Sequence, residues 1–105
     1  MLEGGAGAVV TSSGMAALNL LCQLLDPGDV LVAPHDCYGG TYRLFESLAA
    51  KGHFEVLFVD QGDAEALDAA FARNPRLILT ETPSNPLLRI VDIAAIATRA
   101  RAAGA

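Results

Sequence analysis

The sequence predicts an α/β fold in which helices alternate with strands around a mainly parallel sheet. Short apolar runs bounded by turn residues recur along the chain, as expected for strands buried on both faces. Segments with the apolar spacing of a helix separate these runs, and glycine, proline and aspartate mark the boundaries. Strands and helices that alternate in this way are typical of βαβ units, whose strands run parallel.

The first predicted helix covers residues 14–25 and follows two serines that can cap it. Ser12 and Ser13 supply hydroxyl groups at the expected helix N-terminus. The helix is apolar on nearly all sides, a pattern typical of a buried helix. Residues 26–29 read Asp-Pro-Gly-Asp and end it, because proline cannot continue a helix and glycine accepts turn geometry. Before the serines, the apolar segment Ala8–Thr11 is a candidate for a short strand.

The sequence in the middle of the chain predicts a helix with one strand before it and one strand after it. Residues 30–33 form a continuous apolar run that a proline ends, which indicates a strand buried on both faces. A loop at 35–40 leads to a helix over residues 41–51, and Gly52 is the expected residue after its C-terminus. Residues 54–59 form the second predicted strand.

The last part of the chain predicts two more helices and a third strand. The helices cover residues 63–73 and 92–103, and each is opened by an aspartate that can cap it. The strand covers residues 77–80, and a proline-rich loop follows it at 81–86. Gly104 ends the last helix and leads toward what should be another strand, so we expect the chain to be part of a larger domain.

Polar loops follow the predicted strands and should meet at one edge of the sheet. In open α/β sheets, ligands bind beyond the carboxyl ends of the strands. The loops at 35–40 and 81–86 both follow strands, and the loop at 11–15 joins them if residues 8–11 also form one. We therefore expect these three loops to form a ligand site.

The composition excludes several classes of protein. Of the 105 residues, 52% are hydrophobic and 18% are charged, a balance that excludes an intrinsically disordered chain. The net charge of -5 leaves no basic surface for nucleic acid. No apolar run reaches the roughly 18 residues of a membrane span, and the N-terminal residues lack the features of a signal peptide. The two cysteines form no disulfide framework, so we expect a cytoplasmic protein with reduced thiols and no bound metal.

The segment Thr11–Met15 places hydroxyl groups and a glycine at a predicted helix N-terminus. Unpaired backbone N–H groups and the helix dipole favour an anion there, especially phosphate. Gly14 would let the backbone approach such a ligand closely. Ordinary helix capping explains the same residues. The preceding glycines do not match a dinucleotide-binding motif, and no P-loop lysine follows.

Two residues of the later loops are candidates for ligand contact, each with a structural alternative. Tyr38 could stack on a planar ligand or pack as a surface tyrosine over the sheet edge. Asn85 lies between Ser84 and Pro86, where nearby prolines would fix its amide against a ligand. The alternative is an Asn-Pro pair that only forms a turn.

Charged groups in these loops also have two interpretations each. Glu81 could be a titrating group or a carboxylate satisfied by nearby amides. Arg89 could pair with an anion or remain solvated. His35 and Asp36 could form an acid–base pair, or a hydrogen bond that shapes the turn.

Four stretches in this order and spacing resemble one known family. They read LEGGAGAVVTSSG at residues 2–14, APHDCYGGTYRLF at 33–45, VDQGD at 59–63 and ETPSNPLLRIVDI at 81–93. Together they are similar to the pyridoxal-phosphate (PLP) enzymes of cysteine and methionine metabolism, and the resemblance covers essentially the whole chain. It implies PLP as cofactor and the large domain of the fold-type I transferases.

The resemblance implies roles for the matching positions. Ser13, Gly14 and Met15 match the segment that binds the phosphate of PLP, largely through backbone N–H groups. Tyr38 matches a tyrosine that stacks on the pyridine ring and is proposed to aid proton transfer, which would make it catalytic as well as cofactor-binding. Asn85 matches an asparagine near the phenolic oxygen of the cofactor and the substrate carboxylate.

Other parts of the family's site have no match in this chain. The family carries its cofactor on a lysine in a Ser-x-Thr-Lys motif and holds the pyridine nitrogen with an aspartate, and both would lie downstream. Residues that clamp the phosphate from a neighbouring subunit would lie upstream. Lys51, the only lysine, stands at a predicted helix C-terminus, where it meets the dipole favourably, and we expect no catalytic role for it. We therefore expect residues 1–105 to be a partial PLP-binding domain, without the catalytic lysine segment or the C-terminal domain, and inert in isolation.

The activity implied by the resemblance is γ-replacement in methionine biosynthesis. An O-activated homoserine, expected to be the O-succinyl ester, loses its γ-substituent, and cysteine thiolate adds to give cystathionine (trans-sulfuration). PLP would serve as the electron sink. Elimination of cystathionine by a lyase and sulfhydrylation of activated homoserine use the same scaffold and remain open. The resemblance also implies amino-acid substrates and a homotetramer built from dimers with shared active sites.

Overall fold

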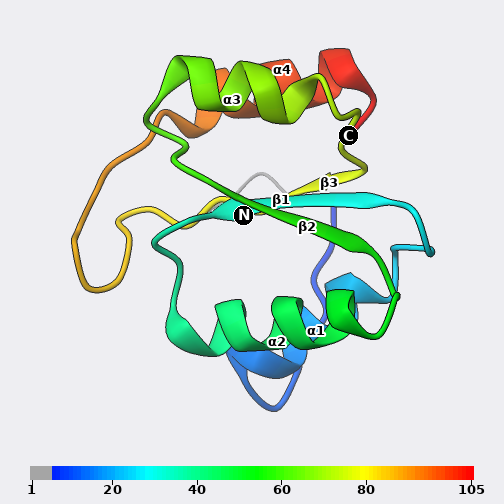
Figure 1. Ribbon diagram of the computed structural model, residues 1–105. Coiled ribbons are helices and arrows are strands. Elements are labelled where there is room, and N and C mark those ends of the chain that lie inside the picture. The colour runs from blue at the N-terminus through cyan, green and yellow to red at the C-terminus, as the bar shows by residue number, and fades with distance from the viewer. Residues whose placement is uncertain (1–5) are drawn as a thin grey trace.

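A parallel sheet lies between two layers of helices in the computed structural model, which describes residues 6–105 (Figure 1). Three strands are seen in this part of the chain, and their order across the sheet is β2-β1-β3. They are β1 (Val30–Pro34), β2 (Glu55–Val59) and β3 (Leu77–Ile78). One layer holds α1 (Gly14–Cys22) and α2 (Gly39–Ala50), and the other holds α3 (Ala64–Phe71) and α4 (Ile93–Ala103). The predicted α/β fold is confirmed.

The central strand β1 pairs in parallel with both of its neighbours. Val30 lies opposite Glu55 of β2, and Leu31 lies opposite Leu77 of β3. Each neighbour follows β1 through at least one helix, so the sheet is built from βαβ units as the spacing predicts. The third strand is shorter than the predicted 77–80, although the N–H of Leu79 still donates to the carbonyl of Val32 at 2.8 Å.

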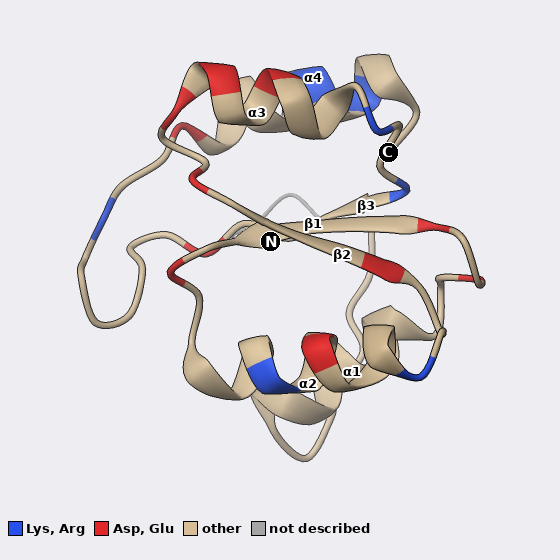
Figure 2. Cartoon of the chain, viewed as in Figure 1, with Lys and Arg blue, Asp and Glu red and all other residues tan. Residues whose placement is uncertain are grey.

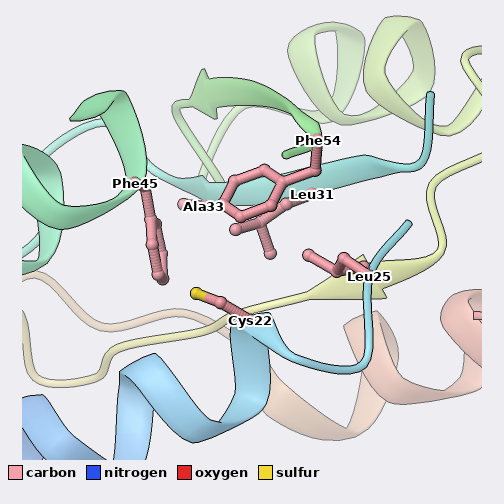
Figure 3. Packing of buried hydrophobic residues seen from close by; sticks show 6 residues of the cluster. All are labelled: Cys22, Leu25, Leu31, Ala33, Phe45 and Phe54. Atoms are coloured by element: carbon pink, nitrogen blue, oxygen red, sulfur yellow. The ribbon is translucent and has the colours of Figure 1, made fainter. Parts of the chain in front are cut away.

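The hydrophobic core forms on both faces of β1, all of whose residues are buried. Successive side chains of a strand point to opposite faces. Leu31 and Ala33 therefore join the larger cluster under α1 and α2 (Figure 3), whose other buried members are Cys22, Leu25, Phe45 and Phe54. Val30 and Val32 face the other way and pack with Ala70 of α3. The predicted burial of this strand on both faces is confirmed.

The first helix differs from its prediction in length and in burial. It ends at Cys22 because the N–H groups of residues 23–25 donate to carbonyls three residues back, which tightens the last turn. One face packs on the sheet and contains the buried Cys22, and the buried Leu25 of the following turn joins the same cluster. Leu20 and Leu24 are 47% and 64% exposed. The expectation of burial on all sides is wrong for the described chain, because only one side of α1 meets the sheet.

The segment before α1 does not form the candidate strand. Residues 8–11 pair with no strand within residues 6–105, and Val9 and Val10 are 79% and 93% exposed. Residues 2–5 of the first motif lie outside the described part of the chain.

Helix ends follow the capping signals of the sequence. Ser13 Oγ accepts from the N–H of Ala16 at 3.1 Å, while the Asp63 and Asp92 carboxylates cap α3 and α4 in the same way. Gly52 and Gly104 follow α2 and α4 with φ of 79°, the left-handed conformation that glycine adopts without a steric cost. Within residues 6–105, no helix has the length and apolar character needed to cross a membrane.

Candidate functional site

The loops that carry Tyr38 and Asn85 are joined by one carboxylate at the carboxyl end of the sheet. The N–H of Tyr38 donates to Glu81 Oε2, and the N–H of Asn85 donates to Glu81 Oε1, both at 3.2 Å. Glu81 is therefore satisfied by nearby amides, the second of the two interpretations that its sequence context allows. These bonds bring the two candidate residues to one place, although 47 positions separate them in the sequence.

Gly40 makes room for the Tyr38 ring and for Met15. A Cβ atom at Gly40 would lie 2.7 Å from Tyr38 Cε1 and 3.1 Å from Met15 Sδ. The first distance is too short for a real side chain and the second is a tight contact, so the two groups occupy the space that glycine leaves open. Met15 belongs to the first turn of α1, which is thereby placed beside Tyr38. The three loops meet as expected, even though residues 8–11 form no strand.

The N-terminus of α1 has open space and free backbone donors. The Ser13 hydroxyl and carbonyl accept from the N–H groups of Ala16 and Ala17. The N–H groups of Gly14 and Met15 donate to no acceptor among residues 6–105. A Cβ at Gly14 would meet nothing within 4 Å, so close packing in this chain does not require glycine there. An anion placed here would meet two free N–H groups and the positive end of the dipole.

The side chains of Tyr38 and Asn85 are available to a ligand. Tyr38 is the N-cap residue of α2, which begins at Gly39, two residues before the predicted start, and its side chain makes no capping hydrogen bond. The residue is 50% exposed. Asn85 is exposed, and its side-chain amide has no hydrogen bond within the described residues.

Ser84 anchors the loop that carries Asn85, a role that the sequence did not indicate. Ser84 is 2% exposed, and its Oγ accepts from the N–H of Arg89 at 3.1 Å. Its own N–H donates to the carbonyl of Arg89 at 3.0 Å, and its carbonyl accepts from Leu88 at 2.8 Å. The peptide bonds before Pro83 and Pro86 are both cis. The sequence signal that could have indicated this role is the position of Ser84 between Pro83 and Pro86, in a loop that follows a strand.

Arg89 connects the loops that follow β1 and β2. Figure 2 shows acidic residues directly after these strands and a basic residue in the long loop between β3 and α4. The guanidinium of Arg89 lies 3.9 Å from Asp36 and 3.5 Å from Asp60. Arg89 thus pairs with anions, as one of its two interpretations proposes. The expected hydrogen bond between His35 and Asp36 is not formed, because Nδ1 and Oδ1 lie 4.0 Å apart, while His35 Nε2 lies 3.4 Å from Arg89.

A cavity of about 320 Å³ lies among these loops. Its lining includes Asp36, Asp60, Gln61, Glu81, Ser84 and Arg89. Gln61 is buried and its Nε2 donates to the carbonyl of Leu79 at 2.8 Å, whereas its Oε1 has no partner. Sequence reasoning missed Gln61, although it lies in the VDQGD motif after β2. Among residues 6–105, no group of three or more His, Cys, Asp or Glu side chains is arranged to hold a metal ion.

The acidic groups also affect a neighbouring thiol. Burial raises the pKa of Cys37 above its ordinary value of 9.0, and the negative charges of Glu81 and Asp36 raise it further. The thiol therefore stays protonated near neutral pH. A protonated thiol is a poor nucleophile and a poor metal ligand.

Comparison with known proteins identifies the family. The model of the family described as Cys/Met metabolism PLP-dependent enzyme matches residues 1–105. The chain belongs to this family. The resemblance of its four motifs is thereby confirmed, and PLP is the cofactor of the family to which it belongs.

Individual relatives include synthases and lyases. Cystathionine gamma-synthase of Escherichia coli (strain K12) is 65% identical over 105 residues, which are 99% of this chain and 27% of the relative. Cystathionine gamma-lyase of Bacillus subtilis (strain 168) is 40% identical over 98% of this chain and 27% of its own length. A crystal structure of cystathionine gamma synthase from Xanthomonas oryzae pv. oryzae, in complex with cystathionine, superposes with a TM-score of 0.96 at 54% identity, covering 99% of this chain and 27% of that one. The chain thus spans about a quarter of the length of these relatives.

The residues of this chain fit part of a PLP site. Free N–H groups at the start of α1 suit a phosphate, and the space left by Gly40 seats an exposed aromatic ring beside them. Lys51 does not belong to this arrangement, because it is the C-cap of α2, whose N-cap is Tyr38. The length of α2 separates the two by about 20 Å.

Proposed function

We propose that this chain is part of the PLP-binding domain of an enzyme that makes cystathionine by γ-replacement on an O-activated homoserine. The observation that carries the proposal is the meeting of the α1 N-terminus, Tyr38 and Asn85, which Gly40 and Glu81 bring together. The 65% identity to cystathionine gamma-synthase of Escherichia coli supports the choice of reaction.

Each of the three loops would make a different contact with the cofactor. The free N–H groups of Gly14 and Met15, with the Ser13 cap, would hold the phosphate at the positive end of α1. Tyr38 would stack on the pyridine ring, and its hydroxyl would be placed to move a proton. The side-chain amide of Asn85 would bind near the phenolic oxygen and the substrate carboxylate. When bound, PLP supplies an electron sink for negative charge that develops on the substrate.

The substrates we propose are O-succinylhomoserine and cysteine. Chemically, the homoserine ester loses succinate from its γ-carbon, and the cysteine sulfur forms the new bond to that carbon. Relatives of this chain also include a cystathionine gamma-lyase at 40% identity, so the specific alternatives are elimination from cystathionine and sulfhydrylation of the activated homoserine. The higher identity to a synthase than to this lyase favours replacement.

Further parts of the enzyme would come from outside this chain. The lysine that carries the cofactor, the aspartate at the pyridine nitrogen and the phosphate clamp of a neighbouring subunit have no match among these 105 residues, so the isolated chain would be catalytically inert. The family resemblance supports a cytoplasmic homotetramer.

Product analysis of the full-length protein containing this chain tests the proposal. Purified protein with PLP is given O-succinylhomoserine and cysteine, and we expect cystathionine and succinate. A parallel reaction replaces cysteine with sulfide, and a third contains cystathionine alone. Homocysteine from sulfide as the main product would favour the sulfhydrylase. Formation of only 2-oxobutyrate, ammonia and cysteine from cystathionine would refute the synthase assignment in favour of the lyase.

A further inference from the structure

Glu81 links the two residues that we propose to contact the ring and the substrate. It follows β3, and each of its carboxylate oxygens accepts one backbone N–H, from Tyr38 and from Asn85. The bond to Tyr38 spans 43 positions of the sequence, so it joins separate loops and does not merely shape one turn. Glu81 binds only the backbone N–H groups of Tyr38 and Asn85, so the side chains of these two residues are free for a ligand.

Within residues 6–105, no other hydrogen bond joins the 37–40 segment to the 80–86 loop. Arg89 approaches His35 and Asp36 from a later part of the chain, at 3.4 and 3.9 Å. The Tyr38 side chain does not cap α2, and the Glu81 carboxylate lies at this helix N-terminus, where the dipole favours negative charge. Within the described residues, Glu81 is therefore the one side chain that hydrogen-bonds to both Tyr38 and Asn85.

We propose that Glu81 is a positioning residue that sets the Tyr38 ring and the Asn85 amide in register for the cofactor and substrate. This role rests on the proposed function, because it matters only if these two side chains bind a ligand. The chemistry requires a carboxylate, which offers an acceptor oxygen to each N–H. A glutamine offers only one acceptor oxygen, and its NH₂ group would face the second N–H donor.

Hydrogen exchange of the full-length, cofactor-free protein tests the link without any activity measurement. The glutamine of Glu81→Gln can accept from only one of the two N–H groups, so we expect the amide of Tyr38 or of Asn85 to lose its acceptor. The peptide covering that amide should exchange about tenfold faster, as for the loss of one such bond. The matched control is Glu65→Gln, the same change on α3, on the opposite face of the sheet. It should leave both peptides unchanged.

Cofactor titration then tests the consequence for the site. We expect Glu81→Gln to weaken PLP binding about tenfold and to reduce the circular dichroism of the bound cofactor. Glu81→Asp keeps both acceptor oxygens on a shorter side chain and should recover part of each loss. In a Tyr38→Ala background, Glu81→Gln should weaken PLP binding less, because a residue that acts through Tyr38 has less to position.

The outcomes separate this role from the proposed function. If the wild-type protein binds PLP and makes cystathionine while Glu81→Gln matches Glu65→Gln in exchange and PLP affinity, the role of Glu81 is wrong and the function stands. If exchange accelerates at Tyr38 or Asn85 but PLP affinity and dichroism are unchanged, Glu81 is structural only, and the proposal is overturned. A wild-type protein that binds no PLP overturns both. If Glu81→Gln fails to fold, the Glu81→Asp variant decides, since it should differ from wild type at these two peptides.

Discussion

The two ends of the sheet are built in different ways. At the amino end of the strands, the chain turns through Gly28, Gly52 and Asn74, which have φ of 95°, 79° and 52°. Most backbone hydrogen bonds within these turns join residues three apart, as between Asn74 and Phe71. The longer contact there, from Arg73 to Glu55, spans 18 positions and joins two exposed side chains. At the carboxyl end, the loops are held by contacts between distant residues: 43 positions separate Tyr38 from Glu81, and 29 separate Asp60 from Arg89.

This difference explains where a ligand site can form. Turns closed by their own backbone leave few free groups, whereas loops held by side chains from other loops keep a ring, an amide and helix N–H groups available. Loops on a rigid scaffold are the usual location of binding residues. Substitutions at the amino end should therefore lower the free energy of unfolding without changing ligand affinity. Substitutions at the carboxyl end should change ligand affinity.

The largest effect should come from Leu31→Ala, because this substitution should disturb the amino end and the carboxyl end of the sheet together. Leu31 is 0% exposed on the strand that supports both ends of the sheet. Truncating a buried leucine costs about 2–5 kcal/mol. Urea unfolding of the full-length protein should show a loss in this range, together with weaker PLP binding. A loss below about 0.5 kcal/mol, the level of a surface change, would contradict the role of β1 as the core of the chain.

Gly40→Ala should weaken the carboxyl end without unfolding it. The new Cβ would lie 2.7 Å from the Tyr38 ring and force it to move. Overpacking of this kind costs about 1–3 kcal/mol, so PLP should bind about tenfold more weakly. The control is Gly39→Ala, where the Cβ would meet only the flexible end of Arg43 at 3.4 Å. Equal PLP affinities in the two variants, measured by titration, would show that the ring position is unimportant.

A substitution at the amino end should have the opposite profile. Gly52 has φ of 79°, which costs about 1–2 kcal/mol for a residue with a Cβ. Gly52→Val should lower the free energy of unfolding by about this amount, and Gly52→Asn should cost less because asparagine tolerates this conformation. We expect unchanged PLP affinity in both. A change in PLP affinity comparable to that of Gly40→Ala would break the distinction between the two ends.

The smallest expected effect concerns pH and the Cys37 thiol. Burial, with the charges of Glu81 and Asp36, raises its pKa above 9.0 in the folded chain. A raised folded pKa stabilises the protein below the unfolded value, and this contribution is lost as pH rises through the folded pKa. Above pH 9.0, wild-type protein should lose slightly more stability than Cys37→Ser, as measured by thermal unfolding across that range. Identical dependence of stability on pH in the two proteins would mean that folding does not raise the pKa of the Cys37 thiol.

Features that depend on neighbouring residues could be predicted from the sequence, whereas contacts between distant residues could not. Caps such as Ser13 and Asp63, and the glycine that follows α2, depend on a few adjacent residues, and the structure confirms them. The positive φ of Asn74 was missed, although asparagine is one of the few residues other than glycine that adopt this conformation. The extent of α1 burial was wrong, because helix composition alone does not say how many sides meet a sheet.

Contacts across the carboxyl end were beyond sequence reasoning. The sequence indicated that the three loops meet, since parallel strands share an edge. It did not indicate that Glu81 would bridge Tyr38 and Asn85, or that Gln61 and Ser84 would be buried. Such pairings depend on the register of strands that are distant in sequence. The assignment of Tyr38 and Asn85 came from the family resemblance, and it stays a prediction.

Hydrogen exchange of the full-length protein with and without PLP tests the central claim most directly. If the three loops form the cofactor site, peptides covering residues 13–16, 37–41 and 84–88 should all gain protection when PLP binds. The turns at residues 26–29, 51–54 and 72–76 should exchange at unchanged rates. Protection at only one of the loops, or at the turns of the amino end instead, would contradict a cofactor site formed by the three loops.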